Sequence, residues 1–305
     1  MDAVLYWITR GLVALVQSLP LTLVARIGRA AGGIVFWLDA RHRRIALKNL
    51  ALCLANEKSA TEIRAIAKEN FRRIGENYAC AIKTADMTAE QLRSHVEFSG
   101  DLDVVSQAAG EGRRSVVGAI GHFGNFELYA RISMCCPGIR CATTYRRLRQ
   151  PSLNRILLSL RERSGCLYFE RRTDASALKS AMQQPGTLLG LLADQHAGRP
   201  GLRIPFFGHS SSTTAAPAIF ALRYDCPLYV AICYRIGLAR WRIEIGPEIP
   251  LRENGKARST EAIMSDVNTA FERAIRRDPA NWFWVHNRWK PVKPRRKQNP
   301  QATGI

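Results

Sequence analysis

The fold of this chain is decided by the stretch Ser115-Val116-Val117-Gly118-Ala119-Ile120-Gly121-His122-Phe123-Gly124-Asn125-Phe126-Glu127. Its first six residues form a short apolar run, which is typical of a buried strand. From Asn125 to Cys135 the spacing of apolar residues predicts a helix. The residues between them, 121–124, are therefore expected to form a strand-to-helix turn.

The same alternation of strand and helix patterns extends outward from this stretch. Strands are expected at Cys141–Tyr145, Cys166–Phe169, Thr187–Ala193, Leu228–Tyr234 and Arg240–Ile245, and helices at Ser152–Arg163, Ala175–Gln184, Ala215–Tyr224 and Ser259–Arg276. Before it, Ala46–Leu54 and Thr61–Met87 are predicted to be amphipathic helices. This pattern indicates an α/β fold, in which helices flank a mostly parallel mixed sheet.

Polar side chains follow two of the expected strands at their carboxyl ends, where sheets of this kind collect functional groups. His122 and Glu127 follow the first strand, and Asp194 follows a later one. On one helix, His122 and Glu127 would lie about 140° apart and could not meet. They can meet if His122 lies in the turn, Gly124 bends it and Asn125 caps the helix. Glu127 would then bind one imidazole nitrogen and leave the other free as a general base.

The spacing alone leaves a second interpretation open, because H-x-x-x-x-E is a short pattern. His122 could be a loop histidine with satisfied hydrogen bonds beside a glutamate that caps the helix. In the catalytic interpretation the chain supplies a base and a carboxylate but no nucleophile. The nucleophile would then be a hydroxyl group of the substrate.

Charge narrows the class of partner. The chain has 45 Lys and Arg against 25 Asp and Glu, a net charge of +20. Such a balance favours a polyanionic partner: nucleic acid, an anionic lipid surface, a phosphorylated substrate or an acidic carrier protein. The 8 cysteines contain no C-x-x-C pair and are expected to be small buried residues in a reducing compartment.

Residues 1–40 are predicted to be a membrane-associated segment. Gly11–Ala25 is an uncharged, mostly apolar run of 15 residues, shorter than the roughly 20 that span a bilayer. Arg26, Arg29 and further cations follow it directly, which argues against a cleaved signal peptide. A helix lying in the cytoplasmic interface fits this pattern. A buried helix of a globular domain is the alternative.

The segment Gly121–Glu127 resembles the H-x4-D/E box of the lysophospholipid acyltransferase superfamily, and the surrounding sequence resembles one branch of it, the lipid A late acyltransferases (lauroyl/myristoyl transferases). Matching stretches run in order through residues 5 to 292: Arg43–Leu50, Thr144–Arg146 before Pro151, Arg161–Arg163, Ala193–Gln195, Pro205–Gly208 with its Ser/Thr-rich turn, and Asn281–Lys290. Two features depart from these patterns. Asn287 replaces an arginine that the branch usually has, which leaves one phosphate or carrier contact open. The F-P-E-G-T box of glycerol-phosphate acyltransferases is absent.

The resemblance implies an enzyme that transfers a fatty acyl chain from an acyl carrier protein thioester to a hydroxyl of a lipid A precursor. His122 would take the proton from that hydroxyl, and Glu127 would hold the imidazole tautomer. Arg161 would stabilise negative charge, and Asp194 would orient this arginine or the substrate. Further contacts to phosphate or carrier are expected from Arg146, Arg163 and Arg288.

The resemblance also implies the organisation and the partners of the chain. Residues 41–290 would form the acyltransferase domain and residues 291–305 a basic tail. The expected partners are acyl carrier protein, a phosphorylated lipid A precursor and anionic lipid at the cytoplasmic face of the cell inner membrane. No cofactor, no metal and no nucleic acid are expected, since His196, His209 and His286 match no metal-ligand spacing and no nucleic-acid motif occurs. Trp282 and the nearby tryptophans are expected to pack in the core or on the membrane face.

Two alternatives to this function remain open. One is an enzyme of the same superfamily that acts on another glycolipid or lysolipid acceptor. The other is a non-enzymatic basic protein that binds membranes or nucleic acid.

Overall fold

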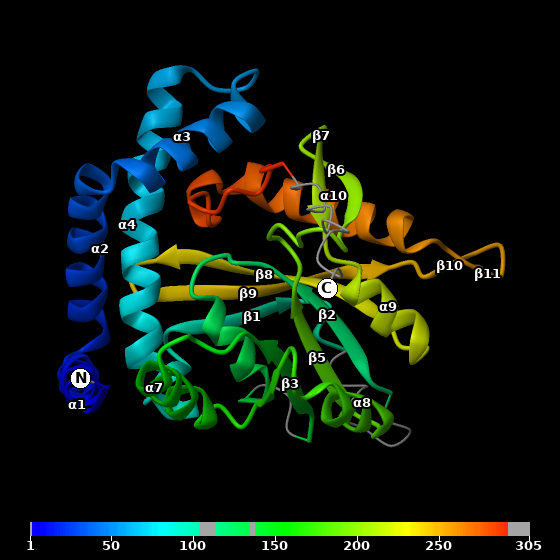
Figure 1. The fold of residues 1–305 in the computed structure, drawn as a ribbon, viewed down its shortest axis with the longest axis horizontal. Helices are drawn as coiled ribbons and strands as arrows, with labels where there is room; N and C mark the ends of the chain where they lie inside the picture. The colour runs from blue at the N-terminus through cyan, green and yellow to red at the C-terminus, as the bar shows by residue number, and fades with distance from the viewer. Residues whose placement is uncertain (1, 104–113, 135–137, 292–305) are drawn as a thin grey trace, which may run out of the picture.

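A seven-stranded sheet runs through the centre of the computed structural model, which describes residues 2–103, 114–134 and 138–291 (Figure 1). Its strands are β1 (Val96–Gly100), β2 (Val116–Ile120), β3 (Arg140–Tyr145), β4 (Leu167–Glu170), β5 (Thr187–Leu192), β8 (Leu228–Gly237) and β9 (Arg240–Ile249). Their order in space is β1-β9-β8-β2-β5-β3-β4. All neighbouring pairs are parallel except the β8–β9 hairpin. The mostly parallel mixed sheet is therefore confirmed.

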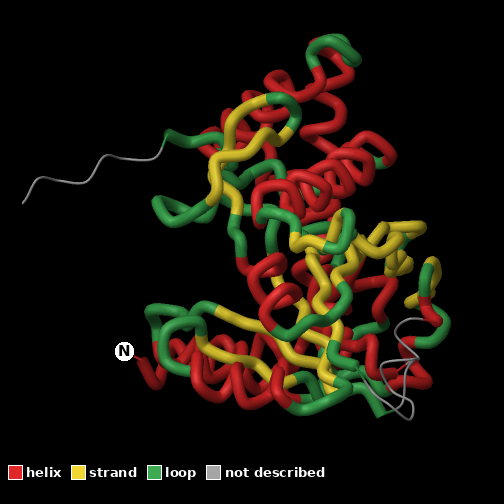
Figure 2. The backbone as a smooth tube through the Cα atoms, turned by 90° about the vertical axis from the view of Figure 1, so that its right-hand side faces the viewer, coloured by secondary structure: helices red, strands yellow, loops and turns green. Residues whose placement is uncertain are grey.

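The two faces of the sheet belong to different core clusters because side chains alternate along each strand. On β2, Val117 and Ala119 face a large core shared with α3 (Ala40–Leu54), α8 (Ala175–Gln183), α9 (Ala216–Arg223) and α10 (Thr260–Arg277). Val116 and Ile120 face the opposite core, which includes Ile132 of the 3-10 helix η1 (Phe126–Met134). Figure 2 shows the strands lying between helices in the perpendicular view.

Helix α4 (Ala60–Thr84) stands along the β8–β9 end of the sheet, and α2 (Leu21–Leu38) lies outside it (Figure 1). Ser59 caps α4 in a capping box with Glu62, so the helix begins at Ala60, one residue before the start predicted at Thr61. Glu76 of α4 is fully buried and accepts hydrogen bonds from Arg235 Nε at 2.8 Å and Ala239 N at 3.0 Å. These bonds fix α4 to the β8–β9 hairpin.

Helices α2 and α4 are in backbone contact. A Cβ added at Gly28 of α2 would lie 2.6 Å from the carbonyl oxygen of Gly75 in α4. The absence of a side chain at Gly28 therefore allows the two helices to pack this closely. In the middle of α2, Arg29 pairs with Glu69 at 3.0 Å and Glu76 at 3.1 Å. One face of α2 is therefore part of the globular core.

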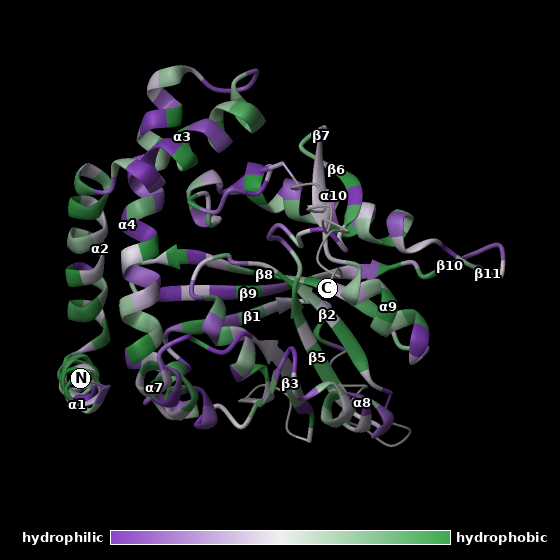
Figure 3. Cartoon of the chain, in the orientation of Figure 1, coloured by the Kyte–Doolittle hydropathy of each residue, from purple (hydrophilic) through white to green (hydrophobic). Residues whose placement is uncertain are grey.

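The chain bends at Pro20 between α1 (Asp2–Ser18) and α2, so the expected apolar run Gly11–Ala25 is divided between two helices. Among the described helices, α2 alone is long and apolar enough to cross a membrane, and 33% of its residues are buried. Figure 3 shows apolar residues along α2 and more polar residues along α4.

The remaining elements are short or lie on the periphery, apart from α7. They are α5 (Ala89–Leu92), α7 (Pro151–Glu162), the hairpins β6–β7 (Leu202–Phe206, His209–Thr213) and β10–β11 (Arg252–Glu253, Lys256–Ala257), and the 3-10 helix η2 (Pro279–Asn281). Strands β1, β6 and β7 were not expected from the sequence, and the helix predicted over Asn125–Cys135 is a 3-10 helix. Of the predicted tail 291–305, all residues after 291 lie outside the described part of the chain.

Candidate active site at the carboxyl ends of β2 and β5

His122 and Asp194 meet because β2 and β5 are neighbouring parallel strands. Ile120 and Leu192 are register partners, so the chain emerges from both strands at the same edge, and each functional residue lies two positions further on. Asp194 Oδ1 accepts a hydrogen bond from His122 Nδ1 at 2.8 Å. Asp194 Oδ2 accepts two more, from His122 N at 2.8 Å and from Trp282 Nε1 at 2.8 Å.

The environment keeps Asp194 ionised. Its side chain is 1% exposed, and burial alone would raise its pKa. The charge of His122 and the hydrogen bonds from His122 and Trp282 outweigh burial and hold the pKa of Asp194 below its usual value. An ionised carboxylate at Nδ1 fixes the proton on that nitrogen and leaves Nε2 as the acceptor nitrogen. This is the arrangement of a general base.

The imidazole of His122 lies between two aromatic rings. The ring centroids of Phe126 and Phe283 are 4.8 Å and 5.9 Å from that of His122. Nε2 of His122 lies 3.4 Å from the side-chain amide nitrogen of Gln195. Two aromatic rings therefore flank the imidazole, and the amide of Gln195 hydrogen-bonds to Nε2.

The expectation that Glu127 holds His122 is wrong. Glu127 instead forms a two-point ion pair with Arg161 of α7, with Arg161 Nε at 3.0 Å and Nη2 at 2.6 Å from its oxygens. Glu127 lies in the first turn of η1, and this 3-10 geometry directs it to α7 rather than back to the loop. The expected pairing of Asp194 with Arg161 is wrong for the same reason: the carboxylate that orients Arg161 is Glu127.

The loop that carries His122 requires glycine at position 124. Gly124 has a φ of +51°, and a Cβ there would lie 2.5 Å from the carbonyl oxygen of Cys233. Its N–H donates to Asn281 O at 3.1 Å. The predicted tight bend is thus present, while Asn125 directs its amide nitrogen to Thr84 Oγ1 at 3.4 Å instead of capping the helix. The loop is attached to the η2 segment near the carboxyl end of the described chain.

His122 separates two cavities of opposite character. The first has a volume of about 290 Å³ and lies between α4, η1 and α7, where Tyr78, Ile82, Leu157 and Phe283 form much of its wall. The second is a larger cleft of about 1010 Å³ on the other side of His122. Its wall contains the cationic residues Arg146, Arg171, Arg172, Arg199 and Lys290. We call the first the apolar cavity and the second the cationic cleft.

A third cavity of about 90 Å³ lies against the sheet beyond the Glu127–Arg161 ion pair, and both residues of the pair line it as well as the apolar cavity. Gly118 of β2 and Gly190 of β5 line this sheet cavity and are direct register partners. A Cβ added at Gly118 would meet no atom closer than 3.9 Å. The paired glycines therefore leave space in the middle of the sheet that side chains would fill.

Three arginines that were predicted to contact phosphate or carrier, Arg146, Arg163 and Arg288, lie in different surroundings. Arg146 is exposed and lines the cationic cleft. Arg163 is also exposed, but it pairs with Asp86 and lines none of the three cavities described above. Arg288 has 0% exposure and donates to Ser212 O and to Thr213 Oγ1 at 2.7 Å. The prediction that Arg288 contacts phosphate or carrier is therefore wrong: it holds the β6–β7 hairpin.

The sequence interpretation missed two contacts. Trp282 was expected only to pack, and it does so with 1% exposure, but its indole N–H also reaches Asp194. The second missed contact is that of the Gln195 amide with His122 Nε2; the sequence indicated Gln195 only as part of the matching stretch Ala193–Gln195. Within the described residues, no group of three or more His, Cys, Asp or Glu is placed to hold a metal ion.

Fold and site together place an imidazole–carboxylate pair at the edge of an α/β sheet, between an apolar cavity and a cationic cleft. The family model of the bacterial lipid A biosynthesis acyltransferases matches residues 1–291. The chain belongs to this family and is an acyltransferase.

Two characterised relatives are similar to the chain. The lipid A biosynthesis lauroyltransferase of Escherichia coli is 26% identical over 296 residues, which cover 94% of this chain and 91% of the relative. The phosphatidylinositol mannoside acyltransferase of Mycolicibacterium smegmatis is 25% identical over 193 residues, 62% of this chain and 61% of the relative. The names of both relatives describe acyl transfer, and the two acceptors differ.

Proposed function

We propose that this chain transfers a fatty acyl group from an acyl carrier protein thioester to a hydroxyl of a phosphorylated lipid A precursor, at the cytoplasmic face of the inner membrane. The observation that carries the proposal is the position of the His122–Asp194 pair between the apolar cavity and the cationic cleft. The apolar cavity suits an acyl chain, and the cleft suits an anionic acceptor. The family and its lauroyltransferase relative support the same acceptor class.

In the proposed reaction His122 Nε2 removes the proton from the acceptor hydroxyl while Asp194 holds the imidazolium that forms. The acceptor oxygen attacks the thioester carbonyl carbon and forms a tetrahedral intermediate. When the C–S bond breaks, the departing thiolate takes the proton from His122. The products are an ester on the acceptor and the free thiol of the carrier.

Arg161 is proposed to stabilise the negative charge of this intermediate. It lines the apolar cavity, the cationic cleft and the sheet cavity, so it lies where acyl chain and acceptor would meet. Its guanidinium stacks over Tyr168 at 5.2 Å and is held in place by Glu127. We therefore assign Glu127 a positioning role, through Arg161, in place of the predicted contact to His122.

The cationic cleft is proposed to bind the phosphates of the acceptor. Arg146, Arg171 and Arg172 are exposed at its wall. The carboxylate of Glu170 at the same wall accepts hydrogen bonds from Arg172 N at 2.8 Å and Thr173 N at 3.0 Å, so it is turned into the backbone. Positive charge therefore dominates this surface, and guanidinium groups bind phosphate in two-point geometry.

Residues 1–40 are proposed to lie in the membrane interface without crossing the bilayer. Exposed apolar side chains cover the outer faces of both helices, among them Trp7, Ile8, Leu12 and Leu15 of α1 and Ile27, Ile34, Trp37 and Leu38 of α2. Arg29 in the middle of α2 pairs with two glutamates of the globular domain, which supports a position along the interface rather than across the bilayer. Exposed cations at Arg10, Arg26, Arg41 and Arg44 suit anionic headgroups.

The proposal is tested with the purified full chain, a lauroyl carrier protein and a phosphorylated glucosamine disaccharide that bears 3-hydroxyacyl chains. Mass spectrometry of the lipid should show the added acyl group with the wild type and none with His122→Ala. His209→Ala is the matched control, because His209 is exposed, its ring hydrogen-bonds to Leu52 O at 3.1 Å, and it lines none of the three cavities described above. No transfer by the wild type would reject this acceptor. Transfer to a mannosylated inositol lipid in the same assay would instead favour the acceptor class named for the mycobacterial relative.

A further inference from the structure

Trp282 occupies a position that packing alone does not require. Its indole N–H points to the one oxygen of Asp194 that does not bind the imidazole, at 2.8 Å. The same oxygen accepts His122 N at 2.8 Å. With Oδ2 bound by two donors, the carboxylate cannot rotate, and Oδ1 is kept opposite His122 Nδ1.

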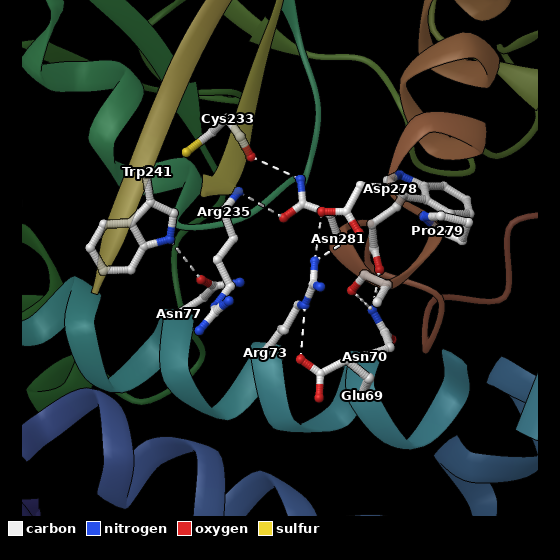
Figure 4. Close-up of polar contacts among 12 residues, drawn as sticks. Glu69, Asn70, Arg73, Asn77, Cys233, Arg235, Trp241, Asp278, Pro279 and Asn281 are labelled. Atoms are coloured by element: carbon white, nitrogen blue, oxygen red, sulfur yellow. Dashed lines mark hydrogen bonds and ion pairs between the residues drawn. The ribbon is translucent and has the colours of Figure 1, made fainter. Parts of the chain in front are cut away.

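The backbone around Trp282 is held from three directions. Asn70 of α4 donates its amide to Ala280 O at 2.9 Å and to Trp282 O at 2.5 Å. Asn281 donates to Cys233 O at 3.0 Å and accepts from Arg235 N at 3.3 Å (Figure 4). Arg73 of α4 pairs with Asp278 just before this segment (Figure 4). The His122 loop is joined to the same place through the hydrogen bond from Gly124 N to Asn281 O.

The three indoles of this region have different partners. Trp284 Nε1 donates to Pro279 O at 2.6 Å, and Trp289 Nε1 donates to Phe206 O at 3.1 Å. Both partners are backbone carbonyls outside the His122–Asp194 pair. Trp282 is the one of the three that reaches a charged group, although Trp282 and Trp284 are equally buried and their ring centroids lie 4.8 Å apart.

We propose that Trp282 is a positioning residue for the general base: its N–H orients Asp194 and disperses the carboxylate charge, so that Oδ1 stays opposite Nδ1 and the imidazole of His122 is aligned. The inference rests on the proposed function of the His122–Asp194 pair. A carboxylate that loses a donor becomes more basic and holds the proton of its imidazole partner more strongly. Without the indole N–H, His122 is therefore expected to stay protonated to higher pH.

Few other groups near Asp194 can contribute to such a change in the pH at which His122 loses its proton. His286, Arg288 and Tyr129 are the further titratable groups that act on it electrostatically. Burial lowers the pKa of His286 to about 4 and that of Arg288 to about 10, and it raises the pKa of Tyr129 well above its usual value. Near neutral pH these three groups therefore keep a constant charge and should not themselves contribute to a change in the pH profile.

The test compares Trp282→Phe with Trp284→Phe, which removes an indole N–H of equal burial from the same segment. A second chain carries 3-benzothienylalanine in place of Trp282, which keeps the bicyclic ring and removes only the N–H. The imidazole of His122 is titrated by NMR in full-length protein labelled at its six histidines, and the pH profile of kcat is measured with the acyl donor and acceptor named above. Both Trp282 replacements should lower kcat about 10- to 100-fold at neutral pH, the size of one hydrogen bond to a charged group. They should also move the His122 titration and the acid limb of the profile to higher pH.

Trp284→Phe should leave unchanged the midpoint of the His122 titration and the midpoint of the acid limb of the kcat profile. The proposal is overturned if the benzothienyl chain titrates like the wild type, or if Trp284→Phe shifts His122 as much as Trp282→Phe does. The NMR titration does not depend on the acceptor. A wild type that is inactive on the chosen lipid would therefore count against the proposed function alone.

Discussion

Replacing Asp194 by Asn tests which carboxylate serves the base, and the hydrogen bonds define the outcome. Oδ2 of Asp194 faces two fixed donors, His122 N and Trp282 Nε1, so the amide oxygen of Asn must take that position. The amide NH2 group then faces His122 Nδ1, where Oδ1 now accepts at 2.8 Å. Two donors cannot face each other, so Nδ1 loses its proton and Nε2 gains it. The nitrogen that should act as the base is then blocked.

The expected loss is large. Where a wrong tautomer disables an imidazole base, kcat falls about 10⁴-fold, which corresponds to about 5.5 kcal/mol. Glu127→Gln should cost much less, because Arg161 keeps one hydrogen bond to the amide oxygen and His122 keeps its partner. About 10- to 100-fold is expected for this change. The structure therefore predicts a difference of at least about two orders of magnitude between the two variants.

Initial rates of acyl transfer by full-length protein in detergent would measure this difference, with His122→Ala as the floor. Thermal unfolding of each variant would show that the losses do not come from misfolding. The reasoning is refuted if Glu127→Gln falls to the His122→Ala floor while Asp194→Asn stays within about tenfold of the wild type, a loss too small for a disabled base.

Three further predictions concern the acyl chain, the membrane and stability. Gly118→Ala tests whether the acyl chain extends from the apolar cavity past the Glu127–Arg161 pair into the sheet cavity, to which this change adds a methyl group. If the chain ends there, the products should shift to shorter acyl chains, by about fivefold in kcat/KM for each excluded methylene, as seen by mass spectrometry with mixed donors. Gly246→Ala, in β9 outside that cavity, should not shift them, and equal effects of the two changes would contradict this placement of the chain end. Trp7→Glu combined with Leu12→Glu should release the protein from anionic vesicles in a sedimentation assay, because each of these exposed side chains contributes about 1.5–3 kcal/mol to membrane binding when it is buried in the lipid. Unchanged pelleting would place the membrane contact elsewhere. Glu76→Gln leaves two arginines without their buried partner and should lower the free energy of unfolding by about 3 kcal/mol in urea titrations, whereas a loss below about 1 kcal/mol would show that water replaces the carboxylate.

The sequence was sufficient for the sheet class and for one half of the site. Short apolar runs ending at residues 120 and 193 predicted β2 and β5, and the rule that function gathers at their carboxyl ends selected both His122 and Asp194. Their contact was not predicted because it depends on the spatial order of strands. Asp194 follows His122 by 72 residues, and the intervening β3 and β4 lie on the far side of β5. Alternating patterns along the chain contain no information on that order.

Other errors have local causes. Glu127 was assigned to His122 on the assumption that it lies in the first turn of a helix capped by Asn125, whereas that turn is 3-10 and Glu127 pairs with Arg161 of α7. Arg288 was treated as a surface cation by its sign alone, but it is fully buried with a cation–π contact to Phe206. Strand β1 was missed although Val96–Ser99 alternates apolar and polar residues, because the run is only 5 residues long and ends at Gly100.

Helix α4 forms one wall of the apolar cavity, and its contacts prevent it from moving outward to open that cavity. On one side its backbone touches α2 at Gly75, and on another Glu76 and Arg73 tie it to the β8–β9 hairpin and to Asp278. With this wall fixed, any widening of the cavity that the proposed exchange of acyl chains requires should come from η1 or α7, which form its other walls, and not from α4.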